Sequence, residues 1–132
     1  MLLTCTFMSP IGEIGLLKEN DNLIKVSFTD TAFKYLDAIN SPNEFKEVIT
    51  QLNEYFYEGR SKFEIQYTFL STTFRSRIYK EMLKIAYGTT LSYSDLATKV
   101  GQPRAFRAVG TACGKNPLPI INPCHRVKGK SS

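Results

Sequence analysis

The pattern of apolar and polar residues changes along the chain from short extended runs to helical spacing. Three runs, at residues 3–8, 14–18 and 23–28, are apolar or partly alternating and are separated by turn residues, so we predict three short strands. From residue 43 to residue 57, apolar residues recur every three or four positions, which predicts a helix with one apolar face. Gly59 follows this pattern and is expected to end the helix.

The second half of the chain carries the signals of further helices. One helix is expected from about residue 74 to residue 87, with candidate hydroxyl N-caps at residues 71–73. Ser92 and Asp95 have the spacing of a capping box, with Asp in place of the usual Glu or Gln. They predict the start of a short helix that ends at Gly101.

The last predicted helix begins at the pair Gln102-Pro103, with Gln102 as its cap and the proline in its first turn, and runs to about residue 114. Its apolar residues, Phe106 among them, are expected to face one way, and Arg104 and Arg107 fall on another face. Two short helices joined by a tight turn, the second with a basic stripe, are typical of a helix-turn-helix. A four-helix core could use the same pattern.

Charge is divided unevenly between the two halves of the chain. Residues 1–66 contain six Lys or Arg and ten Asp or Glu, a net charge of −4, whereas residues 67–132 contain eleven and two, a net charge of +9. The positive balance favours nucleic acid as the partner of the second half. We therefore predict an α+β protein of two domains. Residues 1–66 form a small sheet-plus-helix scaffold, and residues 67–132 form an all-helical unit with a (winged) helix-turn-helix.

Length and composition narrow the class of protein further. A chain of 132 residues suffices for one ordinary domain or two small ones, and no apolar run approaches the roughly 20 residues that cross a bilayer. The N-terminus lacks the charged region of a signal peptide. The cysteines are Cys5, Cys113 and Cys124, without a CxxC pair and with a single histidine. This pattern indicates a reducing compartment and argues against a disulfide framework and against zinc, so we expect a cytoplasmic protein with no membrane partner and no metal.

The strongest chemical signal is the stretch from Asn116 to Val127, which places Cys124, His125 and Arg126 side by side after three prolines. Each proline fixes its own φ and restricts the residue before it, so the cysteine is expected on a rigid turn. A neighbouring imidazole or cation raises the fraction of thiolate, the form that attacks an electrophile. Taken alone, the same residues also fit a buried structural cysteine and a histidine that only satisfies a backbone group.

The sequence Pro123-Cys124-His125-Arg126-Val127 resembles the active-site signature of the methylated-DNA–protein-cysteine methyltransferases, which repair O6-alkylguanine. The resemblance is strong over roughly residues 70 to 127 and weak before them. Further matching positions lie upstream of the signature: Phe74, Tyr87 to Tyr93, Gly101 to Pro103, Arg107 to Gly110, and Asn116-Pro117. The resemblance implies one irreversible transfer of an alkyl group from O6-alkylguanine in double-stranded DNA to Cys124. It also implies base flipping, a monomer, and no cofactor.

The resemblance also implies roles for individual residues. Cys124 would be the alkyl acceptor, His125 the base that acts through a water, and Asn116 the residue that orders the turn. Tyr93 would crowd the phosphate beside the lesion and hydrogen-bond the flipped purine, and Arg107 would take the place of the departed base. The remaining assignments are DNA contacts by Ser94, Gln102 and Arg126, and pocket contacts by Val127 and Pro119.

Three departures from the family pattern bear on these expectations. Asn122 stands where the family usually has isoleucine, and Tyr79 stands where it usually has tryptophan. The family continues past the signature with a glycine-rich loop and a helix, which supplies a glutamate for the histidine, whereas this sequence ends at Ser132. An alternative reading is therefore a non-catalytic or weakly active module that binds alkylated DNA. A helix-turn-helix regulator with a redox-sensing thiol is a more distant alternative.

Overall fold

The computed structural model describes residues 1–28, 38–86, 88–123 and 126–128. The chain forms two compact units, Met1–Thr68 and Phe69–Ser132, which are considered one at a time. The described residues hold no helix that is long and apolar enough to span a membrane.

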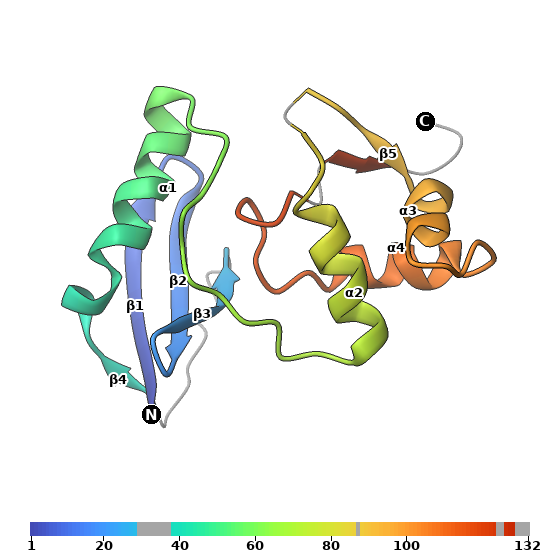
Figure 1. Cartoon of the computed structure of the whole chain (residues 1–132). Helices are drawn as coiled ribbons and strands as arrows, with labels where there is room; N and C mark the ends of the chain where they lie inside the picture. The colour runs from blue at the N-terminus through green and yellow to red at the C-terminus, as the bar shows by residue number, and fades with distance from the viewer. Residues whose placement is uncertain (29–37, 87, 124–125, 129–132) are drawn as a thin grey trace. The chain divides into compact units, whose positions relative to one another are not determined.

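The N-terminal unit is built on a four-stranded sheet with the order β3-β2-β1-β4 (Figure 1). Strands β1 (Leu2–Ser9), β2 (Gly12–Glu19) and β3 (Asn22–Ser27) are antiparallel neighbours, which confirms the three predicted strands. The short strand β4 (Ile39–Asn40) pairs in parallel with β1 and was not predicted. Two residues with positive φ form the turn between β2 and β3, as tight hairpins require: Asn20 at 50° and Asp21 at 69°.

A helix follows the sheet and buries the apolar face that its periodicity predicts. The 3-10 turn η1 (Pro42–Phe45) leads into α1 (Lys46–Glu58), and Gly59 ends the helix with a left-handed φ of 77°. The buried residues of this segment are Phe45, Val48, Gln51 and Leu52. They face a core that the strands supply, with Cys5, Ile14, Leu16, Leu17, Leu23, Ile24 and Val26 among its members. Cys5 packs in this core as a residue of β1.

The connector after α1 is held by hydrogen bonds to this unit. The side-chain amide of Gln51 donates to the Glu64 carbonyl at 3.1 Å and accepts from the Glu64 N–H at 2.9 Å. Further along, the Leu23 N–H donates to the Gln66 carbonyl at 2.9 Å, and the Thr68 N–H donates to the Leu23 carbonyl at 3.1 Å. The connector therefore extends the edge of the sheet at β3.

The C-terminal unit contains α2 (Thr73–Met82), β5 (Leu91–Ser92), α3 (Tyr93–Lys99), α4 (Phe106–Gly114) and β6 (Val127–Lys128). The hydroxyl of Thr72 accepts from the Arg75 N–H at 3.2 Å, as expected of an N-cap. The buried core of the C-terminal unit consists of Ile78, Tyr79, Met82, Ile85, Leu96, Ala97, Val100, Val109, Ala112 and Val127. At its centre the Tyr79 hydroxyl donates to the Ala112 carbonyl at 2.9 Å, which fastens α2 to α4.

Helix α2 is shorter than predicted. It ends at Met82, five residues before the expected end at residue 87, which lies outside the described residues. The chain tightens here into short-range bonds, since Lys84 N–H donates to Glu81 O and Ile85 N–H donates to Met82 O, both at 3.1 Å. The apolar pattern continues through this turn because Ile85 is still buried, so periodicity alone placed the end too late.

Helix α4 begins later than predicted, and Gln102 does not cap it. The Gln102 N–H donates to the Ala97 carbonyl, and the Gln102 carbonyl accepts from the Ala105 N–H, both at 2.9 Å. Residues 102–105 therefore form a separate turn, and α4 starts at Phe106 without a side-chain cap. Phe106, which was expected to share a face with the other apolar residues of this helix, has a side chain that is 43% exposed. The buried part of α4 starts one turn later, at Val109.

Candidate DNA interface and alkyl-acceptor turn

The segment that carries the predicted acceptor, residues 116–127, is called the acceptor turn here. The structure describes it on both sides of Cys124 and His125, while these two residues themselves lie outside the described residues. Upstream, Asn116 bonds to the turn with both ends of its side-chain amide. Its Oδ1 accepts from the Leu118 N–H at 3.1 Å, and its Nδ2 donates to the Asn122 carbonyl at 2.9 Å. The Asn122 N–H also donates to the Leu118 carbonyl at 2.7 Å. Asn116 thus joins the two ends of the segment that leads to Pro123.

This segment also holds a strained residue. Ile120 has a φ of +72°, a conformation that β-branched residues rarely adopt and that costs of order 1–3 kcal/mol. The neighbouring side chains of Leu118 and Ile121 are buried at 0% and 6% exposure, and this burial holds the turn in place. Pro119, predicted to line the pocket, is half-buried beside Ile120.

Downstream of Cys124 and His125, Arg126 makes contacts through its backbone and its side chain. Its N–H donates to the Pro123 carbonyl at 3.0 Å, which ties together the two ends of the Cys124–His125 pair. Its guanidinium Nη1 donates to the Ile85 carbonyl at 2.8 Å, just after α2. The predicted DNA contact of Arg126 stays a prediction, and the contact to Ile85 is one that the sequence did not indicate.

A short parallel pairing joins the acceptor turn to the start of α3. Leu91 in β5 pairs with Val127 in β6, and Ser92 pairs with Lys128. We predicted an all-helical unit, so this pairing is an addition to the predicted fold. It places the residue that follows β5, Tyr93, beside the strand that follows the Cys-His-Arg sequence.

Tyr93 is positioned by the capping box and by a glycine. The Ser92 hydroxyl accepts from the Asp95 N–H at 3.0 Å, and the Asp95 carboxylate accepts from the Ser92 N–H at 3.1 Å, so the predicted capping box is confirmed. On α4, a Cβ at Gly110 would lie 3.2 Å from Cε2 of the Tyr93 ring, closer than most real contacts. A side chain at position 110 would require the Tyr93 ring to shift by a few tenths of an ångström, so glycine suits this close approach of α4 to the ring.

The capping box makes the stability of α3 depend on pH. The hydrogen bond from the Ser92 N–H holds the pKa of the Asp95 carboxyl below its ordinary value. A carboxyl with a lowered folded-state pKa stabilises the fold above its unfolded-state pKa, and this contribution is lost as the pH falls through the lower, folded-state value. We expect Asp95→Ala to remove this acid-sensitive part of the stability. Thermal unfolding from neutral to acidic pH would show it, as a difference between the two proteins that shrinks on acidification. A difference that persists unchanged at the acid end would contradict the assignment.

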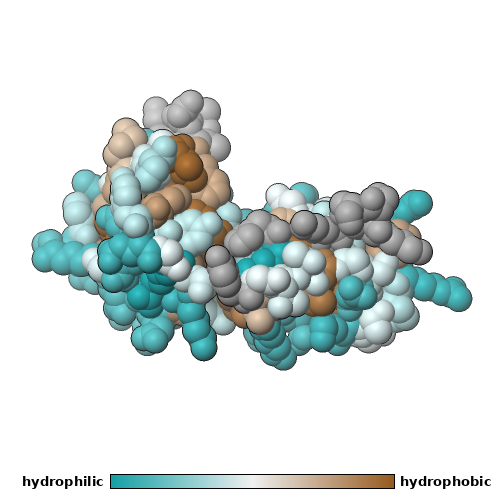
Figure 2. All heavy atoms as spheres, turned by 90° about the horizontal axis from the view of Figure 1, so that it is seen from above, coloured by the Kyte–Doolittle hydropathy of each residue, from teal (hydrophilic) through white to brown (hydrophobic). Residues whose placement is uncertain are grey.

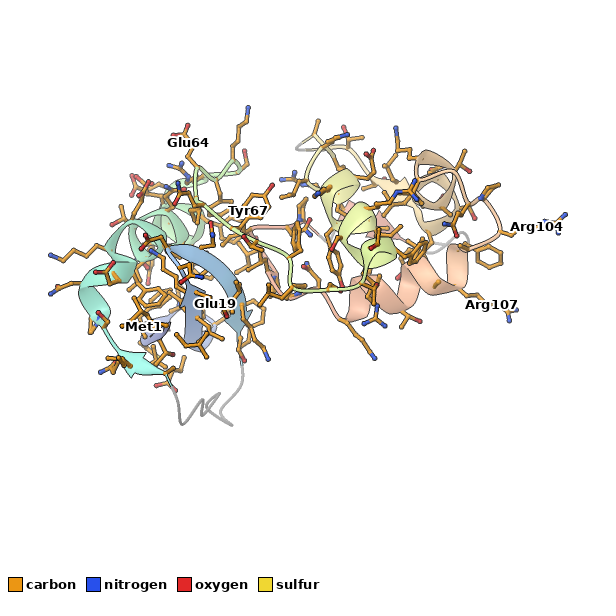
Figure 3. The ribbon with its side chains drawn as sticks, turned by 60° about the horizontal axis from the view of Figure 1, so that its bottom comes forward. Met1, Glu19, Glu64, Tyr67, Arg104 and Arg107 are labelled. Atoms are coloured by element: carbon orange, nitrogen blue, oxygen red, sulfur yellow. The ribbon has the colours of Figure 1, made fainter. Side chains whose placement is uncertain are left out.

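The helix-turn-helix surface is basic and open. Arg104 and Arg107 are exposed, and both extend away from the same side of the unit (Figure 3). Gln102, Pro103, Arg104 and Ala105 border a hollow of about 550 Å³ at the turn. In Figure 2, apolar residues gather on the N-terminal unit, while the visible surface of the C-terminal unit is mainly polar. Ser94 is half-buried on α3, and its carbonyl accepts from the Thr98 hydroxyl at 3.0 Å.

Asn122 has a structural role that the sequence did not reveal. In the sequence it stands out only as a departure from the family pattern, which usually has isoleucine at this position. Its side chain is 0% exposed, and neither amide atom has a hydrogen-bond partner among the described residues. A buried polar group without a partner costs about 1–3 kcal/mol. The signal in the sequence was the polar residue directly before Pro123, where an apolar one is expected.

We expect Asn122→Val to raise the free energy of unfolding by about 1 kcal/mol, because it removes two unsatisfied polar atoms at modest change in volume. Asn122→Asp is the matched control and should lower stability, since it buries a carboxyl in the same space. Urea denaturation of the three proteins measures both effects. Equal midpoints for Asn122→Val and the parent would mean that the amide is satisfied in solution.

The described residues do not gather into a metal site, since no three His, Cys, Asp or Glu side chains come together within them. The described cysteines are Cys5 and Cys113, and no disulfide joins them. Burial raises the pKa of the Cys5 thiol, which keeps it protonated. Cys113 is half-buried, with its Sγ 4.0 Å from Sδ of Met82.

Comparison with known proteins agrees with this geometry over the whole chain. Residues 2–69 match the family description "6-O-methylguanine DNA methyltransferase, ribonuclease-like domain", and residues 73–132 match "6-O-methylguanine DNA methyltransferase, DNA binding domain". The methylated-DNA–protein-cysteine methyltransferase of Mycobacterium tuberculosis H37Rv is 37% identical over 128 residues, which cover 96% of this chain and 78% of the relative. The constitutive enzyme of Bacillus subtilis is 35% identical over 133 residues, covering 96% and 81%.

Solved structures give the same result. The crystal structure of Mycobacterium tuberculosis O6-methylguanine methyltransferase superposes with a TM-score of 0.92 at 36% identity, covering 99% of this chain and 81% of that one. Mycobacterium tuberculosis OGT in complex with DNA superposes with a TM-score of 0.89 at 37% identity, covering 97% and 79%. The fold and the matched sequence define a DNA-binding alkyltransferase. The chain belongs to the methylated-DNA–protein-cysteine methyltransferase family.

Proposed function

We propose that this protein repairs DNA by direct reversal, moving an alkyl group from O6 of guanine to the sulfur of Cys124. The observation that carries the proposal is the β5–β6 pairing in a chain of this family. The pairing brings the segment after Pro123-Cys124-His125-Arg126 to the start of the helix that bears Tyr93. This pairing supports a shared site for the acceptor Cys124 and for Tyr93.

The basic helix-turn-helix holds the duplex, and the damaged guanine leaves the stack, because its O6 position is buried in paired DNA. Arg107 on α4 occupies the place of the departed base. Ser94 and Gln102 contact the DNA backbone, and Tyr93 hydrogen-bonds N3 of the extruded purine. That hydrogen bond stabilises the charge that develops on the leaving guanine.

In the transfer step, the thiolate of Cys124 attacks the alkyl carbon. A carbon–sulfur bond forms, the bond from that carbon to O6 breaks, and its electron pair goes to the purine, which takes up a proton and leaves as neutral guanine. His125 accepts the thiol proton through a water. Asn116 holds the turn by the two hydrogen bonds of its side-chain amide. Pro119 and Val127 line the pocket, where the Val127 backbone accepts from the guanine amine. The thioether product is stable, so each molecule acts once.

A stoichiometric repair assay tests this function. The substrate is a duplex in which one O6-methylguanine blocks a restriction endonuclease, so that cleavable DNA reports repair. We expect the amount of cleavable DNA to reach a plateau at one duplex per protein molecule and to rise linearly with added protein. The alternative, a module that binds alkylated DNA without repairing it, predicts preferential binding of the lesion duplex and no cleavable DNA. The comparisons give no support to that alternative.

A further inference from the structure

Phe106 is an exposed aromatic residue on a helix whose other large apolar side chain is buried. It is the first residue of α4 and is 43% exposed, whereas Val109, on the next turn of the helix, is 0% exposed. The core of the C-terminal unit does not include Phe106 among its buried or partly buried members. The core of the unit therefore does not account for the exposed part of this aromatic ring.

The surroundings of Phe106 connect it to the predicted DNA contacts. Arg107 follows it directly, and Arg104 lies in the preceding turn; both side chains extend into solvent from the same side of the unit (Figure 3). Phe106 and Gly110 are four residues apart, so they share a helix face at a separation of about 5–6 Å between Cβ positions. Gly110 is the position against which the ring of Tyr93 packs. Phe106 is thus next to Arg107 along α4 and on the same helix face as the glycine that the Tyr93 ring contacts.

An apolar ring among guanidinium groups fits a partner of matching chemistry. The partner must offer negative charge on its outside and flat apolar surfaces within reach of the ring. A DNA duplex has both, since phosphates border the groove and stacked bases lie inside it. An apolar groove on a protein would remove water from the two arginines without supplying an opposite charge, and this desolvation disfavours binding. Proteins that bind the minor groove commonly insert apolar side chains between base steps and unstack them.

We propose that Phe106 is a wedge that enters the DNA beside Arg107 and opens the base step next to the flipped guanine. This inference rests on the proposed function, because it assigns the ring to the same DNA complex. Flipping a base requires unstacking on both of its faces. Arg107 fills the vacated position, and the ring of Phe106 covers the exposed face of a neighbouring base, so that the open step is stabilised.

The test measures binding and unstacking separately from repair. The duplex carries O6-methylguanine with the fluorescent base 2-aminopurine next to it, and 2-aminopurine brightens when it is unstacked. The binding experiments use proteins that also carry Cys124→Ala, so that the lesion is not consumed. We expect Phe106→Ala to weaken binding about tenfold, as loss of one base–aromatic contact does, and to remove most of the fluorescence increase. With Cys124 present, the second-order rate constant of repair should fall by a similar factor.

Two variants serve as controls. Phe106→Tyr keeps the ring and should retain binding and fluorescence. Leu70→Ala removes another exposed apolar side chain of the same unit, 61% exposed, and should change neither. Circular dichroism checks that each variant is folded. We expect the Phe106 variants to fold because the side chain is exposed. Parent-like affinity and fluorescence for Phe106→Ala would overturn the wedge. If the protein with Cys124 fails to repair the duplex, the proposed function fails, and the fluorescence change still decides whether Phe106 opens the step.

Discussion

Cys124→Ala is expected to abolish alkyl transfer completely while leaving lesion binding within about twofold of the parent. The reaction needs a sulfur nucleophile, and alanine supplies none. The flanking contacts that shape the turn come from other residues. Asn116 bonds to Leu118 and Asn122, and Arg126 bonds to Pro123 and Ile85. Because these bonds do not involve the thiol, the variant should fold and hold DNA.

The other two cysteines provide the matched controls for this prediction. Cys5→Ala and Cys113→Ala should both repair one lesion per molecule, although each removes a packed side chain and lowers stability somewhat. Burial raises the pKa of the Cys5 thiol, which disfavours its thiolate. The restriction assay gives the yield for all three variants, and a fluorescence-anisotropy titration gives their affinity for the lesion duplex. Residual transfer by Cys124→Ala, or loss of transfer by Cys113→Ala, would contradict the assignment of the acceptor.

Tyr79→Ala is expected to lower the free energy of unfolding by about 3–5 kcal/mol, as truncation of a large buried aromatic does. Tyr79 is 1% exposed, its ring centroid lies 5.1 Å from that of Phe69, and its hydroxyl donates a hydrogen bond to the Ala112 carbonyl. The change leaves a cavity between α2 and α4 and removes the bond that fastens them. Since a whole domain is stable by only about 5–15 kcal/mol, this is a substantial part of the stability of the C-terminal unit.

Tyr79→Phe separates the contribution of the ring from that of the hydroxyl. It keeps the packing and removes one buried hydrogen bond, which is worth about 1 kcal/mol. The Ala112 carbonyl also accepts from the Lys115 N–H at 3.1 Å, so it keeps a partner, and the cost should be at the low end. Urea unfolding monitored by circular dichroism measures both variants. Equal losses for Tyr79→Phe and Tyr79→Ala would show that the hydroxyl, and not the ring, carries the stability.

The parts of the fold that could be predicted are those with a local signal. The strands β1 to β3 and helix α1 repeat apolar residues at their own period, and Ser92 and Asp95 mark the start of α3 directly. The turn between α3 and α4 is tight, as expected. Its Gln102 backbone hydrogen-bonds to Ala97 and Ala105, so α4 starts later in the sequence than predicted. Local patterns therefore identified β1 to β3 and α1 to α4 and misplaced two helix ends.

The features that could not be predicted depend on contacts distant in sequence. Strands β4, β5 and β6 have two residues each, too few to show alternation, and each exists only through its partner strand. The exposure of Phe106 depends on where the core of the unit ends. Helical periodicity shows which residues share a face but not how far along the helix the core extends. The roles of Cys124 and His125 came from the resemblance, and the structure contributes the bonds on either side of them.

The most direct test of the central claim is to locate the methyl group after repair. Trypsin cuts after Lys18, Arg107, Lys115 and Arg126, so Cys5, Cys113 and Cys124 fall in three different peptides. The protein is mixed with an excess of duplex containing O6-methylguanine, digested, and analysed by tandem mass spectrometry. The account predicts one added methyl group, on Cys124 within the peptide from Asn116 to Arg126, and unmodified peptides for the other two cysteines. A methyl group on Cys5 or Cys113, or no modified cysteine after full incubation, would contradict it.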